Sequence, residues 1–223
     1  MGSYAAVLFD VDGTLLDSGE YIFRAFEHVI EQRRFPARSR AELAAVVGMS
    51  LKECYRVLTP SDDLDTLCDE HRSFQRSRLE PPGLFKNTLP TLQALSRLGV
   101  RMAAVTNRSR TSSVATLQHT GIAGFFGAIV SAEDVALLKP HAEPVLKALE
   151  ALGIPPAQAV MVGDTDADIG AGRNAGTLTV GVTYGFHGEK VREYHPDCVI
   201  SDIAELLPLM TRDGRTFSPA AGP

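Results

Sequence analysis

Short runs of apolar residues are spread along the chain and alternate with more polar segments. The runs cover residues 5–10, 100–107, 127–132, 159–164, 178–183 and 197–200. Within each run the apolar residues are continuous, which is typical of strands that are covered on both faces. Apolar residues also recur at helical spacing over residues 88–98 and 143–152. This alternation predicts an α/β fold, with a parallel sheet and helices on both of its faces.

The first two runs are farther apart than the others, because residues 11–99 lie between them. In most of that interval apolar residues recur at the spacing of a helix, over residues 20–34, 40–47, 50–58 and 62–79. Turn-forming residues flank the helical segment, Gly19 on one side and EPPG at residues 80–83 on the other. The pattern therefore predicts a sheet-containing core of residues 1–18 and 83–223, with an α-helical domain of residues 19–82 inserted into it.

Composition narrows the class of protein. The chain has 223 residues, 44% of them hydrophobic, and a formal net charge of −5, so it is expected to fold and to lack a nucleic-acid-binding surface. Its three cysteines, Cys54, Cys68 and Cys198, have no CxxC spacing, which favours a reducing compartment. No signal-peptide pattern and no membrane-spanning stretch is evident. We expect a cytoplasmic monomer or homodimer that binds neither nucleic acid nor membrane.

Polar residues that could take part in catalysis or ligand binding lie where the predicted strands end. These residues are Asp10, Asp12, Thr106, Asn107 and Asp164. Ligands of an open parallel sheet bind beyond the carboxyl ends of its strands, so these side chains should converge on one rim. Lys139, which precedes Pro140, is expected to reach the same rim. Three acids, a lysine and a hydroxyl can together hold a divalent cation and an oxyanion.

Two of these acids could hold Mg²⁺, whose preferred ligands are carboxylate oxygens and water. Asp10 and Asp164 are the expected ligands, and Asp168, one helical turn further on, could orient metal-bound water. The GDTDAD sequence at residues 163–168 lacks the glycine and the distal glutamate of a Ca²⁺ loop. Asp166 is expected to do no more than favour the start of a helix.

The remaining residues suit phosphoryl transfer. An aspartate can attack phosphorus, and an acid two positions further on, such as Asp12, can move the proton of the leaving oxygen. Lys139 could neutralise the transferred charge. Other groups could donate hydrogen bonds to phosphoryl oxygens, namely the Thr106 and Asn107 side chains and the backbone N–H groups of Gly13 and Thr14.

With four motifs in order, the chain resembles the haloacid dehalogenase superfamily, in particular its phosphoglycolate phosphatase branch. The motifs are DVDGT at 10–14, Thr106 with Asn107, KP at 139–140, and GDTDAD at 163–168. AGRNAG at 171–176 and GVTYGFHG at 181–188 add to the likeness. The resemblance implies a Rossmann-like core whose helical insertion is a mobile cap, and a Mg²⁺-dependent phosphatase acting on a small phosphorylated metabolite.

The resemblance also implies a role for each matching residue. Asp10 would be the nucleophile and Asp12 the general acid and base. The metal would be held by the Asp10 side chain, the Asp12 carbonyl and Asp164, with Asp168 nearby, and the phosphoryl group by Thr106 and Lys139. Cap loops of this family reach the substrate near residues 46–53, where Lys52, or Arg24 from the preceding helix, could bind an anionic group.

Three other functions remain open from the sequence. A sugar phosphomutase, such as a β-phosphoglucomutase, would use the same acids but usually carries a Glu-Asp pair where this chain has Gly163-Asp164. A 2-haloacid dehalogenase would lack the second acid, which is present here as Asp12. A non-catalytic binding protein with this fold would not need every chemical position filled.

Overall fold

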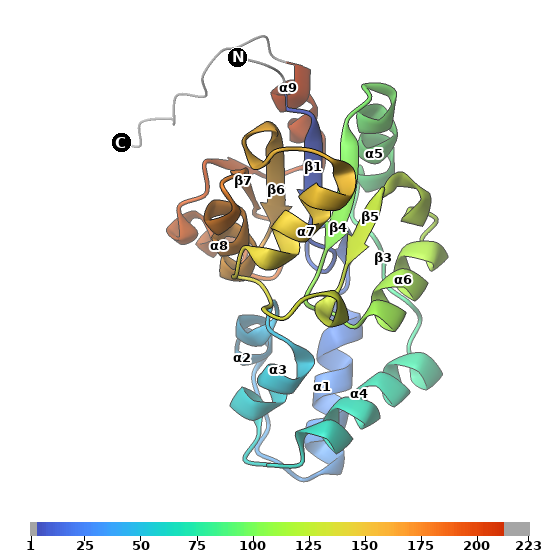
Figure 1. The fold of residues 1–223 in the computed structure, drawn as a ribbon. Coiled ribbons are helices and arrows are strands. Elements are labelled where there is room, and N and C mark those ends of the chain that lie inside the picture. Colours follow the sequence, from blue (N-terminus) through green and yellow to red (C-terminus); the bar gives the residue numbers. More distant parts are fainter. Residues whose placement is uncertain (1–3, 212–223) are drawn as a thin grey trace.

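A parallel sheet of six strands forms the centre of the molecule (Figure 1). The structure is a computed structural model and describes residues 4–211. The strand order is β5-β4-β1-β6-β7-β8, and every neighbouring pair is parallel. The strands are β1 (Ala6–Phe9), β4 (Arg101–Val105), β5 (Ala128–Val130), β6 (Ala159–Gly163), β7 (Leu178–Val182) and β8 (Cys198–Ile200). The α/β fold expected from the sequence is confirmed.

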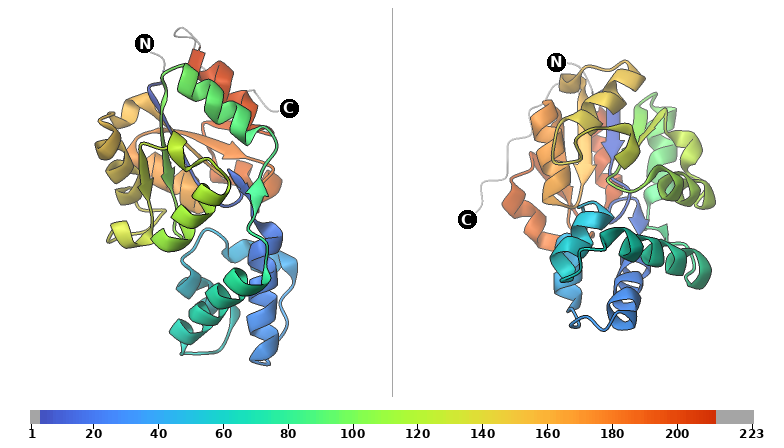
Figure 2. Two further views of the ribbon diagram at one scale, coloured as in Figure 1. Left: turned by 90° about the vertical axis from the view of Figure 1, so that its right-hand side faces the viewer. Right: turned by 60° about the horizontal axis from the view of Figure 1, so that its bottom comes forward.

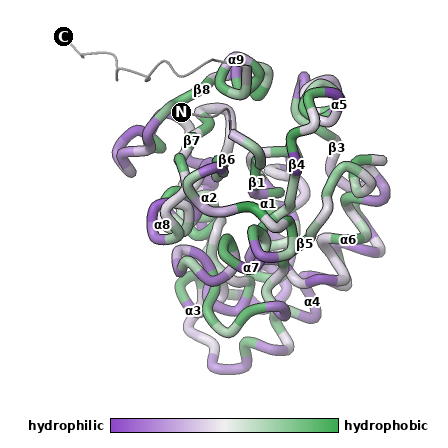
Figure 3. Tube along the Cα trace, turned by 45° about the horizontal axis from the view of Figure 1, so that its top comes forward, coloured by the Kyte–Doolittle hydropathy of each residue, from purple (hydrophilic) through white to green (hydrophobic). Residues whose placement is uncertain are grey.

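Helices cover both faces of this sheet, as the continuous apolar strands require. On one face lie α5 (Thr88–Arg97), α6 (Arg110–His119) and α9 (Leu206–Thr211), whose leucines pack against alternate residues of the strands. On the other face lie α7 (Glu143–Leu152) and α8 (Asp166–Ala175). Figure 3 shows hydrophobic colouring on β4 within the sheet and on β8 at its edge. The core is therefore a layer of apolar side chains on each side of the sheet.

The α7 helix shows how the sequence specifies such an element. Its buried residues Val145, Ala148, Leu149 and Leu152 have the i, i+3, i+4, i+7 spacing of one helical face. The helix ends at Gly153, which has a left-handed φ of 65°. In contrast, α6 was not singled out from the sequence, because much of its buried face consists of Ser113 and Thr116 rather than large apolar residues.

Four helices between the first and second long strands pack against one another below the sheet (Figure 2). They are α1 (Gly19–Gln32), α2 (Arg40–Val46), α3 (Leu51–Leu58) and α4 (Leu64–Arg78). Side chains of Ser39, Ser50 and Asp63 cap the starts of α2, α3 and α4. The four helices enclose a hydrophobic cluster of their own, which includes Phe26 and Tyr55. This helical unit is thus packed separately from the core of the sheet.

A two-stranded sheet joins the helical unit to the rest of the molecule. Strands β2 (Leu16–Asp17) and β3 (Gly83–Leu84) pair antiparallel where the chain leaves the core and where it returns (Figure 2, left). Sequence patterning predicts turns here rather than strands, because two residues are too few to show a period. The predicted C-terminal loop, residues 211–223, lies outside the described residues except for Thr211, which ends α9.

Candidate active site

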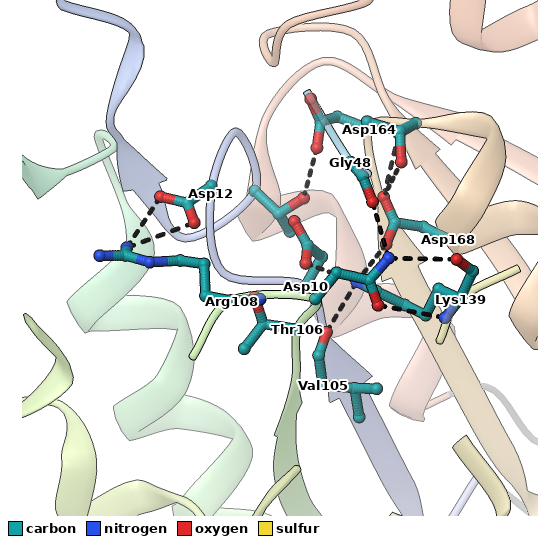
Figure 4. A network of polar contacts seen from close by, with 12 residues as sticks. Asp10, Asp12, Gly48, Val105, Thr106, Arg108, Lys139, Asp164 and Asp168 are labelled. Carbon is teal, nitrogen blue, oxygen red and sulfur yellow. Dashed lines mark hydrogen bonds and ion pairs between the residues drawn. The ribbon is translucent and has the colours of Figure 1, made fainter. Parts of the chain in front are cut away.

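The central strands bring the predicted polar residues to one rim. Strands β4, β1 and β6 are direct neighbours, and Thr106, Asp10 and Asp164 follow their last residues. Asp10 continues the ladder, since its N–H donates to Val162 O at 2.9 Å, so its side chain is fixed where the strand ends. All three side chains are buried. Figure 4 shows Asp10, Asp164 and Asp168 close to Lys139.

Lys139 is a buried cation between two carboxylates. Its Nζ lies 2.6 Å from Asp10 Oδ1, 2.6 Å from Asp168 Oδ1 and 2.8 Å from Val105 O. Burial opposes the charge of the ammonium, but the two carboxylates outweigh burial and raise the pKa of Lys139. The Asn107 side chain holds the Lys139 backbone, accepting from its N–H and donating to its carbonyl, both at 3.1 Å. Lys139 lies ahead of α7, as a fixed charge at the rim.

The acids at this rim carry more negative charge than the local cations balance. Burial, and then the charge of Asp168, raise the pKa of Asp10 to about 7, although Lys139 partly opposes this. Burial and the neighbouring carboxylates likewise raise the pKa of Asp164 well above its usual value. Two cations, Lys139 and Arg108, face four buried carboxyl groups, Asp10, Asp12, Asp164 and Asp168. If all four were ionised they would leave an excess of two negative charges, which is why Asp10 and Asp164 hold their protons to higher pH.

These residues fit a divalent cation. Asp10, Asp164 and Asp168 each place a carboxylate oxygen within 4.8 Å of the others. Asp10 Oδ1 accepts from Lys139, while its Oδ2 has no hydrogen-bond donor within residues 4–211. Asp168 is more occupied, because Oδ1 accepts from Lys139 and Oδ2 accepts from the N–H and hydroxyl of Thr165. Each oxygen of Asp164 accepts one hydrogen bond, against three bonds in all for Asp168. Asp10 and Asp164 are therefore better placed than Asp168 to bind a metal directly, and Asp168 positions Lys139.

Gly13 and Thr14 both support the Asp164 carboxylate. The Gly13 N–H donates to Leu16 O at 3.0 Å, so the prediction that this amide points at a phosphoryl oxygen was wrong. Gly13 has a φ of 80°, and a Cβ there would lie 2.4 Å from Asp164 Oδ2. The Thr14 hydroxyl donates to Asp164 Oδ1 at 3.3 Å, and the Phe186 N–H donates to Oδ2 at 2.7 Å. The turn after β1 thus holds the Asp164 carboxylate in place.

Asp12 is held by an arginine that sequence reasoning missed. Arg108 Nη1 donates to both Asp12 oxygens, at 3.0 and 3.3 Å, and Nη2 donates to the hydroxyls of Ser112 and Thr116. In Figure 4 the Asp12 carboxylate is turned towards Arg108, while Asp10 faces Lys139. The signal in the sequence was the position of Arg108 directly after Thr106 and Asn107, at the end of a strand.

A cavity of about 210 Å³ lies between this rim and the helical unit. The rim contributes Asp10, Asp12, Thr106, Asn107, Arg108 and Lys139, and the helical unit contributes residues 47–52 with Ile22, Phe26, His71, Arg72 and Gln75. The two parts touch at Gly48, whose carbonyl accepts from Asn107 Nδ2 at 2.7 Å. The rim side of this cavity contributes carboxylates and cations, whereas the helical unit contributes apolar side chains together with Lys52, Arg72 and other polar residues.

The two residues of the helical unit that were predicted to bind an anionic group, Lys52 and Arg24, differ in whether they line the cavity. Lys52 lines the cavity, but its Nζ is paired with Asp65 at 2.8 Å and its side chain is 49% exposed. Arg24 is exposed and does not line the cavity. His71 also lines it, and burial lowers the pKa of this histidine to about 3, so the ring is neutral. Its Nδ1 lies 2.9 Å from the Tyr55 hydroxyl.

Comparison with known proteins gives the family of this chain. Residues 7–182 match the model of the haloacid dehalogenase-like hydrolases. The chain belongs to that family. It is 35% identical over 209 residues to pyrophosphatase PpaX of Bacillus pumilus, covering 93% of this chain and 96% of the relative. The motifs therefore occur in the same order as in a related phosphohydrolase because the two proteins share an ancestor. The predicted superfamily is confirmed.

Solved structures share the fold of this hydrolase. A haloacid dehalogenase-like family hydrolase from Streptococcus pneumoniae superposes with a TM-score of 0.83 at 25% identity, covering 93% of this chain and 99% of that one. A predicted phosphoglycolate phosphatase from Haemophilus somnus superposes with a TM-score of 0.83 at 23% identity, covering 94% and 99%. These structures confirm the fold, while the family match and the pyrophosphatase relative make the chain an enzyme of the phosphatase class. Among residues 4–211 no helix has the length and apolarity needed to cross a bilayer.

Proposed function

We propose that this hydrolase is a Mg²⁺-dependent phosphatase that removes a phosphoryl group from a small metabolite through an aspartyl-phosphate on Asp10. The observation that carries the proposal is the placement of Asp10, buried beside Lys139 at the charged rim that lines the cavity. A volume of about 210 Å³ is below the range of about 300–1,000 Å³ that is common for ligand pockets, which supports a small substrate.

The reaction uses the two acids of the first motif in turn. One carboxylate oxygen of Asp10 attacks phosphorus while the other would remain for the metal, and the bond from phosphorus to the leaving oxygen breaks. In its protonated form Asp12 gives a proton to that oxygen, and the carboxylate that results takes a proton from the water that hydrolyses the aspartyl-phosphate, which restores the acid. Lys139 keeps Asp10 oriented and offsets the negative charge of the phosphoryl group. Thr106 faces the same cavity and can donate its hydroxyl to the phosphoryl group. The Asn107 side chain, which was predicted to do the same, is instead committed to Gly48 O and to the backbone of Lys139.

A bound Mg²⁺ would neutralise charge between the nucleophile and the phosphoryl oxygens. Asp10 and Asp164 would hold it, with the Asp12 carbonyl as the third protein ligand that the family resemblance implies. Thr14, Phe186 and the close approach of Gly13 keep Asp164 in the orientation that such binding needs. Asp168 would act through Lys139 and through water rather than as a direct ligand.

We propose further that residues 19–82 act as a mobile cap over a catalytic core of residues 1–18 and 83–223. The narrow β2–β3 connection and the separate hydrophobic cluster of the helices support this division. Closure would exclude bulk water during attack by Asp10. The molecule would work in the cytoplasm as a monomer or homodimer, with a small phosphorylated metabolite as its partner and no nucleic acid or membrane.

The experiment is a phosphate-release screen with purified protein. Small phosphorylated compounds, including pyrophosphate, phosphoglycolate and hexose 1-phosphates, are assayed with Mg²⁺ and with EDTA. We expect phosphate release that requires the metal and is absent in Asp10→Asn, whose circular dichroism spectrum should match the wild type. Isomerisation of a hexose phosphate as the main reaction would replace the phosphatase with a phosphomutase. Metal-free release of halide from 2-haloacids would instead identify a dehalogenase.

A further inference from the structure

The cavity is lined by four cations, Lys52, Arg72, Arg108 and Lys139, and they differ in exposure. Lys52 and Arg72 pair with Asp65 and Asp69 on the surface, with side chains 49% and 40% exposed. Lys139 is committed to Asp10 and Asp168. Arg108, 17% exposed, is therefore the one other cation of the cavity lining that lies largely away from solvent. Its charge has no part in the mechanism above.

The guanidinium of Arg108 is held in a fixed orientation. The hydroxyls of Ser112 and Thr116, which lie one and two turns along the same helical face, accept from Nη2, while Nη1 binds Asp12. The Nε–H donates to no atom of residues 4–211. A planar, preorganised guanidinium of this kind suits the recognition of a phosphate or carboxylate.

Its position beside Asp12 places Arg108 on the side of the leaving group. Asp12 must direct one oxygen at the leaving oxygen in order to transfer its proton there. Both oxygens of Asp12 now accept from Arg108 Nη1, at 3.0 and 3.3 Å, so this turn removes one of the two contacts that Nη1 makes. A partly buried arginine that loses an acceptor is destabilised unless another anion takes its place. An anionic oxygen on the leaving group can supply that acceptor.

From this geometry we infer that Arg108 is a specificity residue that selects substrates whose leaving group carries its own anionic oxygens, a phosphate or a carboxylate close to the scissile bond. The inference rests on the proposed phosphatase function. When the P–O bond breaks and Asp12 protonates the leaving oxygen, Arg108 transfers its hydrogen bonds from Asp12 to the departing anion. If the leaving group is neutral, the guanidinium of Arg108 stays bound to Asp12. This bond opposes the turn of the Asp12 carboxyl towards the substrate.

The test compares two substrates of nearly equal size, phosphoglycolate and its amide, which lacks only the carboxylate charge. Pyrophosphate is assayed beside them, to tell phosphate from carboxylate as the anion that Arg108 prefers. The measured quantity is the ratio of kcat/KM for an anionic substrate to kcat/KM for the amide. We expect a ratio of about tenfold or more in the wild type, the usual size of a charge-assisted hydrogen bond. In Arg108→Met the ratio should fall to about one, and Arg108→Lys should retain part of it.

Arg72→Met is the matched control, since it removes another arginine of the cavity lining that is paired on the surface. Its ratio should equal that of the wild type. Thermal melting of each variant checks the fold, and Arg108→Lys keeps the test valid if Arg108→Met melts early. An unchanged ratio in Arg108→Met, or equal losses on all substrates, overturns the inference while the phosphatase stands. No Asp10-dependent turnover of any of these compounds overturns the proposed function and this inference together.

Discussion

Replacing Lys139 by methionine tests whether the rim is held together by one buried cation. The substitution keeps much of the side-chain volume but removes the charge that lies 2.6 Å from both Asp10 and Asp168. Removing one partner of a buried ion pair costs about 3–5 kcal/mol, because the remaining charge stays buried without compensation. We expect Lys139→Met to lower the free energy of unfolding by about that amount at pH 8 in the absence of metal.

The cost should depend on pH with a definite sign. Without Lys139, burial and mutual repulsion raise the pKa of the Asp10 carboxyl further above its unfolded value, which is near 4. A raised carboxyl pKa means that the folded variant takes up protons as pH falls, whereas the unfolded chain does not yet do so. Its stability relative to the wild type therefore rises as pH falls from 8 towards 7, by about 1.4 kcal/mol per pH unit for each proton that the folded variant binds in excess of the folded wild type. The difference levels off below pH 7, where Asp10 of the wild type is protonated as well.

Urea denaturation with EDTA, at pH 8 and at pH 5.5, measures both effects. Lys52→Met is the control, because its pair with Asp65 is exposed and should contribute less than about 1 kcal/mol, with little pH dependence in this range. A deficit in Lys139→Met below about 1 kcal/mol at pH 8, or the same deficit at both pH values, would refute the argument that Lys139 stabilises the buried carboxylates.

Three further results are expected. Because the pKa of Asp10 is about 7 without metal, Mg²⁺ measured by calorimetry should bind more tightly at pH 8 than at pH 6; equal affinities would count against Asp10 as a ligand. Gly13→Ala should destabilise the protein more than Gly99→Ala, since both have a left-handed φ but only the first meets Asp164, and equal melting temperatures would contradict the close approach. Because burial lowers the pKa of His71 to about 3, the advantage of the wild type over His71→Gln should shrink by up to about 1.4 kcal/mol per pH unit below pH 6.5; parallel pH–stability curves would exclude this.

Much of the fold could be read from the sequence, because strand and helix periods are properties of local sequence. The continuous apolar runs became buried strands, and the stretch 143–152 became α7 with the same bounds. The position of Asp10, Thr106 and Asp164 at one rim followed from a general property of parallel sheets, whose strands all end on the same side. The interval between the first two runs was long enough to reveal an inserted helical unit.

Short or polar elements could not be predicted in this way. The pair β2–β3 has two residues in each strand, which is too short for a pattern. The α6 helix buries Ser113 and Thr116, so its face towards the sheet does not look apolar in the sequence. Gly13 was expected to direct its N–H at the substrate, but the backbone of the turn gives that donor to Leu16. A hydrogen-bond direction depends on the path of the chain, which residue type alone does not determine.

The sequence by itself determined which acids stand at the ends of the strands, because a strand that is buried on both faces must end where its apolar run ends. Only the tertiary structure decided what each acid contacts. Asp10 meets Lys139 from 129 positions away, and Asp12 meets Arg108 from 96 positions away. These partners come together because neighbouring strands of the sheet are distant in the chain, and the folded geometry decides which cation holds the nucleophile and which one lies beside the proton donor.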